Sequence, residues 1–132
     1  MARYAQISLE TKQEGMYNIT DSVINAIAES GVREGLCVVH CPHTTTGLTI
    51  NENADPDVTR DMLLALDEIS PDLAGFHHRE GNSAAHVKAS LMGAGLTLIV
   101  REGRPVLGTW QGVYFCEFDG PRRRRVHVQV MG

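Results

Sequence analysis

The sequence predicts an α+β fold: one compact domain, residues 1–132, with a mostly antiparallel or mixed β-sheet and about three helices. Short segments that alternate apolar and polar residues predict strands, and three segments with apolar residues at helical spacing predict helices. The two kinds of segment do not alternate regularly, and most links between them are short and contain glycine or proline. This order favours hairpins over the strand–helix repeats of a doubly wound parallel sheet.

The N-terminal third should contain two strands, a helix and a third strand. Residues 4–9 alternate apolar and polar side chains, and residues 16–19 form a short second strand. Thr20 is expected to act as the N-cap of a helix that ends at Gly31. Residues 36–39 are apolar on both faces, which is typical of an interior strand.

The middle of the chain is expected to form a strand followed by a helix. In residues 48–51 the apolar and polar side chains face opposite sides, so this strand has a core face and a face available to a ligand. Asp55 should cap the next helix, with Pro56 as its first residue. The predicted buried face of this helix consists of Val58, Met62, Leu66 and Ile69.

A third helix and three strands complete the prediction. The helix should run from about Ser83 to Met92, ended by one of the glycines that follow. Residues 96–100 and 109–118 are predicted strands. Residues 125–130 alternate strictly and predict a last strand whose inward side chains are Val126, Val128 and Val130.

The composition excludes several classes of protein. A formal net charge of −4 and a pI near 5.8 argue against a general nucleic-acid binder, which is usually basic. No apolar run approaches the roughly 20 residues of a membrane span, and the N-terminus lacks the apolar core of a signal peptide. Cys37, Cys41 and Cys116 form no CxxC pair, so reduced thiols in a cytoplasmic protein are the simplest explanation.

Residues 41–56 concentrate the polar chemistry of the chain. They contain an imidazole, four hydroxyls, two amides and two carboxylates within sixteen positions. A buried polar group without a partner costs roughly 1–3 kcal/mol, so these side chains should bond to one another or face a ligand. We interpret the segment as the floor of a small polar site, in which His43, Asn51, Glu52 and Asp55 are the candidate catalytic residues.

The histidines suggest a metal site. His43, His77 and His86 come from three distant segments, and a folded metal site is usually assembled in this way from neutral imidazoles. Glu52, Asp55 and Glu80 could add oxygen ligands or orient an imidazole. The chain has no compact HxxxH or HExxH motif, and local hydrogen bonding of surface histidines is an equally acceptable explanation.

The segment 108–112 contains the only tryptophan, Trp110, between two glycines. Its indole could stack on a heterocycle, and Gln111 could hydrogen-bond the edge of that ring. An alternative explanation is that Trp110 is a core residue or an anchor at a subunit interface.

Four consecutive arginines, residues 122–125, form a local cationic patch suited to phosphate. On a strand alternate members point to opposite faces, so at most two could meet one anion. Lys88, close to His86, could supply another cation. A solvated run that protects an edge strand from aggregation is the commoner explanation for such a patch.

Taken together, these segments resemble the YjbQ-like family, often described as secondary thiamine-phosphate synthases. The matching residues are His43-Thr44-Thr45, Leu48 to Asn53, Asp55-Pro56, Val58, Asp61, Glu80-Gly81-Asn82, His86-Val87-Lys88, Gly108-Thr109-Trp110-Gln111, Glu117 and Asp119 to Arg122. The resemblance spans essentially the whole chain in the right order. The family's loop histidine corresponds to His77 or to its neighbour His78.

The resemblance implies a cytoplasmic homotrimer with a weak activity that joins hydroxymethylpyrimidine diphosphate to a thiazole phosphate, giving thiamine phosphate and pyrophosphate. The expected partner is a small phosphorylated substrate, not a nucleic acid or a membrane, and the expected cofactor is a divalent metal ion, zinc or magnesium/manganese. Substrate-binding residues would be Thr44, Thr45, Lys88, Trp110, Gln111 and Arg122, and metal ligands His43, His77 and His86. The alternative is a non-catalytic trimer that binds a small phosphorylated metabolite or anion.

Overall fold

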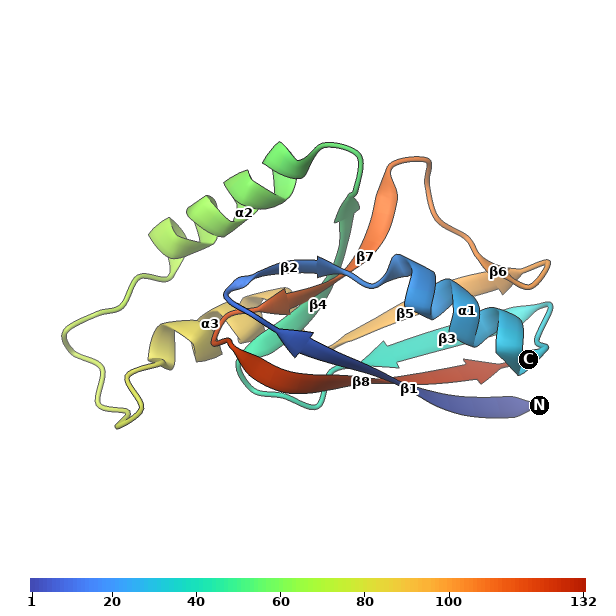
Figure 1. Ribbon diagram of the computed structural model, residues 1–132, viewed down its shortest axis with the longest axis horizontal. Coiled ribbons are helices and arrows are strands. Elements are labelled where there is room, and N and C mark those ends of the chain that lie inside the picture. The colour runs from blue at the N-terminus through green and yellow to red at the C-terminus, as the bar shows by residue number, and fades with distance from the viewer.

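The computed structural model describes all 132 residues and confirms the predicted α+β class, with three helices and two antiparallel sheets (Figure 1). The larger sheet has the strand order β1-β8-β3-β5-β6, and the smaller one β2-β7-β4. The elements are β1 (Ala2–Thr11), β2 (Gly15–Asn18), α1 (Thr20–Ser30), β3 (Gly35–His40), β4 (Thr46–Glu52), α2 (Pro56–Ile69), α3 (Ser83–Met92), β5 (Gly95–Arg101), β6 (Arg104–Pro105), β7 (Gln111–Glu117) and β8 (Arg122–Met131). No helix of the structure has the length and apolar character needed to cross a membrane.

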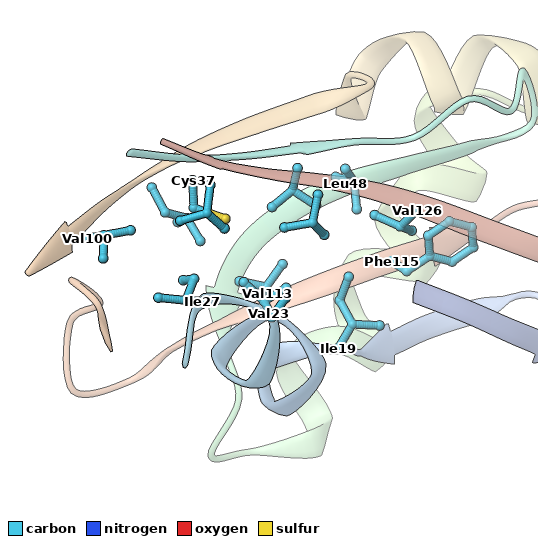
Figure 2. Close-up of a cluster of buried hydrophobic side chains, with 14 of the residues drawn as sticks. Ile19, Val23, Ile27, Cys37, Leu48, Val100, Val113, Phe115 and Val126 are labelled. Atoms are coloured by element: carbon cyan, nitrogen blue, oxygen red, sulfur yellow. The ribbon is translucent and has the colours of Figure 1, made fainter. Parts of the chain in front are cut away.

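The main core lies between the two sheets and against α1 (Figure 2). β8 contributes the three valines predicted to point inward, and each of them is at most 1% exposed. The smaller sheet contributes Leu48, Val113 and Phe115, and α1 contributes Val23 and Ile27. Burial of each such side chain stabilises the fold by roughly 1.5–3 kcal/mol, so strand alternation alone explains the main packing contact.

The start of α1 differs from the prediction. Ile19, not Thr20, is the N-cap residue and makes no side-chain hydrogen bond, and the Asn18 Oδ1 atom accepts the Thr20 N–H at 3.0 Å. The Thr20 hydroxyl instead bonds Asn18 Oδ1 at 2.6 Å and accepts the Val113 N–H at 2.9 Å. The hydroxyl therefore attaches the helix to β7, a partner that is 93 residues away in the sequence. At the other end Gly31 adopts the left-handed conformation, with φ 74°, as predicted.

α2 begins as predicted but is not buried as predicted. The Asp55 carboxylate accepts the Asp57 N–H at 2.9 Å, and Pro56 is the first helical residue. No residue of α2 is buried, and Ile69 is 67% exposed. Only Leu63 and Leu66 of this helix pack against the second core cluster, which lies over the outer face of the smaller sheet. Of the predicted stripe, Val58, Met62 and Leu66 are half-buried and Ile69 is exposed, so the single chain covers this apolar face only in part.

Two further features position the candidate site. A Cβ on Gly47 would lie 2.6 Å from Met92 Cβ, so the glycine allows α3 to rest directly on β4. β7 begins at Gln111, not at residue 109, because Gln111 Oε1 accepts the Gly108 N–H at 2.8 Å and closes a turn. Trp110, which was predicted to lie in this strand, therefore lies in the turn before β7.

Candidate functional site

Two adjoining cavities lie where the loop before β4, the start of β8 and α3 meet. The first, here called the polar cavity, has a volume of about 330 Å³ and no apolar side chain in its lining, which includes Thr44, Thr45, His78, His86 and Arg122. The second, here called the His43 cavity, has a volume of about 500 Å³ and is lined by His43, Thr46 and Ser90 among others. Thr44 and His86 line both cavities, so the two cavities adjoin, and the second also has Ala89 and Ala94 in its lining.

A buried ion pair lies behind the polar cavity. Arg124 Nη2 is 2.6 Å from Glu117 Oε2, and Arg124 Nε is 2.8 Å from Glu117 Oε1, so the ion pair is bidentate. Arg124 Nη2 also donates to Thr45 Oγ1 at 2.9 Å, and the Thr11 hydroxyl donates to Glu117 Oε1 at 2.6 Å. The pair therefore joins β1, β7, β8 and the loop before β4 at one point.

Burial alone would raise the pKa of Glu117, but hydrogen bonds from Arg124, Thr11 and the Asp119 backbone N–H lower it below its ordinary value. The carboxylate is therefore charged at neutral pH and matches the guanidinium. Sequence reasoning did not find this pair, although a signal was present. Arg124 has the strand parity of the inward valines of β8, and Glu117 has that of Val113 and Phe115 in β7.

Arg122 lies at the mouth of the polar cavity with its side chain 46% exposed. Its Nη2 is 3.0 Å from Asp119 Oδ2, and its Nε donates to the Asp119 carbonyl at 2.9 Å. Asn82 Nδ2 also donates to Asp119 Oδ2, at 2.7 Å. Burial raises the pKa of Asp119, but these donors and the charge of Arg122 lower it overall. The Asn82 Oδ1 atom is buried without a hydrogen-bond partner, so the cavity wall offers one unused acceptor.

His43 is held by the edge of β8. The pairing of β3 with β8 ends at His40 and His127, and beyond it His43 Nε2 lies 3.0 Å from the Arg125 backbone nitrogen. Burial lowers the pKa of His43, and the charges of Arg124 and Arg125 lower it further. The Arg125 carbonyl oxygen lies 3.1 Å from the same Nε2, so the tautomer decides whether Nε2 accepts or donates, and in either case Nδ1 is the ring nitrogen left for a ligand.

The loop histidine next to His86 is His78. The two ring centroids are 5.4 Å apart, with the planes at 80°, and both rings line the polar cavity. His77 is exposed and lines neither cavity. Of the three predicted metal ligands, His43 and His86 therefore line one cavity together, whereas His77 lies apart from them.

A metal ion does not fit the residues present in the single chain. No three His, Cys, Asp or Glu side chains come close enough together to hold one. The polar cavity is lined by two arginines, Arg122 and Arg124, and by two carboxylates, Glu80 and Asp119. Arg124 is paired with the buried Glu117, and Arg122 contacts Asp119 but is 46% exposed, so Arg122 is the cationic group that a ligand in this cavity can reach.

The remaining predicted residues form a second group at the far end of β4. This strand runs from Thr46, at the cavity, to Glu52, about 20 Å away at 3.3 Å per residue. Glu52 is the register partner of Gln111, and Asn53 N–H donates to the Trp110 carbonyl at 2.9 Å. Asn51, Glu52, Asp55, Trp110 and Gln111 thus lie towards the far end of β4, and none of them lines the polar cavity or the His43 cavity.

Lys88 also lies away from the cavities. Its Nζ bonds the Asp67 carboxylate of α2 and lies 3.4 Å from Glu14 Oε1, and the lysine is only 5% exposed. Burial lowers the pKa of Lys88, but the hydrogen bond and charge of Asp67 and Glu14 raise it overall. In this chain Lys88 links α3 to α2 through its bond to Asp67.

Comparison with known proteins shows one family throughout. The model described as UPF0047 protein YjbQ-like matches residues 5–132. UPF0047 protein YugU of Bacillus subtilis is 52% identical over 92% of this chain and 93% of its own length. UPF0047 protein MJ1081 of Methanocaldococcus jannaschii is 51% identical, over 92% and 88%. A Clostridium acetobutylicum crystal structure, of an uncharacterised protein of this kind, has a TM-score of 0.94 at 54% identity and covers 96% of this chain and 99% of its own.

Proposed function

The chain belongs to the UPF0047 YjbQ-like family, and from this premise we propose that it binds a small phosphorylated substrate and performs a transfer of the thiamine-phosphate-synthase type. One observation supports the proposal most directly: a cavity with an entirely polar lining that has a half-exposed arginine at its mouth. Phosphate is bound by such sets of hydroxyl and guanidinium donors.

The donors available to a phosphoryl group can be counted. Thr45 Oγ1 accepts from Arg124, so its O–H is left to donate into the polar cavity. The Thr44 hydroxyl makes no hydrogen bond within the chain and lines both cavities. Arg122 retains N–H groups beyond those that contact Asp119. These three residues can hold a phosphoryl group without any metal ion.

In the proposed reaction the bond between the pyrimidine methylene carbon and the diphosphate oxygen breaks, and its electron pair leaves with pyrophosphate. The lone pair of the thiazole nitrogen forms the new carbon–nitrogen bond. Negative charge accumulates on the leaving oxygen, where Arg122 and the two threonine hydroxyls would stabilise it. His43 Nδ1, the ring nitrogen that does not contact the Arg125 backbone, would position the substrate from the adjoining cavity.

We propose that the site is completed across the interfaces of a homotrimer. The second group of candidates, with Trp110 63% exposed, would then reach the cavity of a neighbouring subunit. The exposed apolar residues of α2, such as Leu64 and Ile69, suit burial in the same contact. Cytoplasmic location is part of the proposal and is supported by the three buried free thiols.

Subunit complementation tests the shared site. We expect light scattering to give a mass of three chains, and Arg122→Gln and Trp110→Ala each to lower turnover. Trimers mixed from the two variants should regain part of the activity, because some sites then combine two intact halves. Mixed trimers that form, as native mass spectrometry would show, but regain no activity would contradict the shared site.

The reaction itself is tested with hydroxymethylpyrimidine diphosphate and the thiazole phosphate, following thiamine phosphate by mass spectrometry and pyrophosphate by a coupled assay. We expect both products in equal amounts, and we expect substrate binding to persist in EDTA because no metal-ligand cluster assembles in the chain. Calorimetric binding without either product would favour the non-catalytic alternative. The metal content of the purified protein, compared with that of His43→Ala/His86→Ala, tests the predicted metal ligands directly.

A further inference from the structure

We propose a second anion-binding site on the outer face of the larger sheet, where β1 and β8 lie side by side, that takes the phosphoryl group of a small phosphorylated molecule (Figure 1). A third cavity of about 510 Å³ lies here, and Leu9 is its only apolar residue. Its other lining residues include Gln6, Ser8, His43 and Arg125. The site is separate from the polar cavity and shares with it only the buried Arg124.

The strand register places these groups together. Along β8 Arg124 points inward, so Arg123 and Arg125 point to the outer face. Opposite them on β1 lie Glu10 and Ser8, their respective register partners. Side chains directly opposite on one face of an antiparallel pair lie close enough to act on one ligand.

The two outer arginines differ in what they contact. Arg123 Nε lies 3.3 Å from Glu10 Oε1, an exposed pair in which the two charges offset each other. The Arg125 guanidinium makes no ion pair and no hydrogen bond within the chain, although the same residue's backbone N–H binds His43. Arg125 therefore carries the uncompensated positive charge of this cavity, and all the N–H groups of its guanidinium are free to donate.

The neighbours of Arg125 are mainly donors. The Ser8 hydroxyl makes no hydrogen bond within the chain, and Gln6 Oε1 is already occupied by the Tyr4 hydroxyl at 3.2 Å, which leaves the Gln6 amide N–H groups free. His43 contacts the Arg125 backbone through Nε2, which leaves its Nδ1 without a partner in the chain. The one carboxylate in the lining, Glu10, is the partner of Arg123. A cavity with a free guanidinium and several donors, and with its acid already paired, selects an anion.

A solvated surface arginine needs neither a cavity nor donors on neighbouring residues, and this distinguishes the site from an ordinary charged strand edge. The inference does not depend on the proposed transferase activity, because its uncompensated cation, Arg125, is not among the side chains proposed to hold the substrate. His43 lines both this cavity and the His43 cavity, so a bound anion here would lie next to the candidate site.

Site-resolved titration with inorganic phosphate tests the inference, using amide NMR signals of the intact protein and sodium chloride at matched ionic strength as the reference. We expect saturable shifts at Ser8 and Arg125 that chloride does not reproduce. Arg125→Gln should weaken phosphate binding at these signals about tenfold or more, as expected for loss of a charge-assisted contact. Arg101→Gln, which alters an exposed arginine of β5 in the same sheet, should leave them unchanged.

Arg122→Gln separates this inference from the proposed function. It should remove phosphate shifts near His86 and leave those at Ser8, whereas Arg125→Gln should do the reverse. The inference is overturned if Arg125→Gln leaves the Ser8 titration unchanged, if Arg101→Gln weakens it equally, or if Arg122→Gln alone abolishes it. A change of oligomeric mass in Arg125→Gln with phosphate affinity retained would also overturn it, by assigning Arg125 to a subunit contact.

Discussion

Replacement of Arg124 by leucine is expected to lower the free energy of unfolding by about 3–5 kcal/mol. The substitution leaves the Glu117 carboxylate, which is 0% exposed, without its guanidinium partner in the core. It also removes the donor to Thr45, which fixes the loop that lines the polar cavity. Urea denaturation followed by circular dichroism measures the change.

The matched control is the neighbouring arginine. Arg123→Leu removes an exposed pair with Glu10 and should change stability by no more than about 0.5 kcal/mol. The double variant Arg124→Leu/Glu117→Leu removes both charges, so it should be more stable than the sum of the single losses predicts. A cost below about 1 kcal/mol for Arg124→Leu would show that the pair behaves like a surface salt bridge.

The same pair predicts the acid sensitivity of the fold. The pKa of Glu117 is lowered in the folded protein, so its stabilising contribution is fully present above the ordinary value of 4.5. It is lost as the pH falls below that value through the folded pKa, because the unfolded chain then binds the proton more readily. In Glu117→Gln this part of the pH dependence should disappear.

Replacement of Arg122 by glutamine is expected to weaken binding of a phosphorylated substrate by about tenfold to a hundredfold. A charge-assisted hydrogen bond contributes about 1.5–3 kcal/mol, and 1.4 kcal/mol corresponds to a factor of ten. Stability should change little, because the side chain is 46% exposed and its partner Asp119 keeps its bond from Asn82. Isothermal titration calorimetry with the pyrimidine diphosphate measures the effect.

Arg122→Lys separates charge from geometry. It keeps the positive charge but loses the planar fork, so its affinity should lie between those of the wild type and Arg122→Gln. Arg101→Gln, remote from the cavities on β5, serves as the control and should bind as the wild type does. If Arg122→Gln binds as tightly as this control, the polar cavity is not the site of the phosphoryl group.

Much of the fold could be predicted because it depends on local periodicity. The inward valines of β8, the Asp55 cap with Pro56, and Gly31 at the end of α1 all follow from backbone geometry that a short segment already expresses. The same alternation also predicts that Arg124 points inward. Its position within a run of four arginines instead suggested an exposed side chain. A run of charged residues suggests exposure to solvent, but on a strand the odd or even position of a residue determines which face of the sheet its side chain is on.

The candidate site required tertiary structure because its members lie far apart in the sequence. Thr45 meets Arg124 across 79 positions, and Lys88 binds Asp67 and Glu14, which sequence reasoning could not pair with it. Trp110 was predicted in a strand but lies in a turn, because the Gln111 side chain accepts the Gly108 N–H.

The sequence by itself thus determined the α+β class, most helix and strand positions and the inward face of the last strand. The tertiary structure decided which polar side chains meet. It grouped His78, His86, Thr44, Thr45 and Arg122 in one cavity and left Asn51, Glu52, Asp55, Trp110 and Gln111 at the other end of β4. The physical reason is that periodicity specifies which way a side chain faces, whereas its neighbour depends on how separate elements pack.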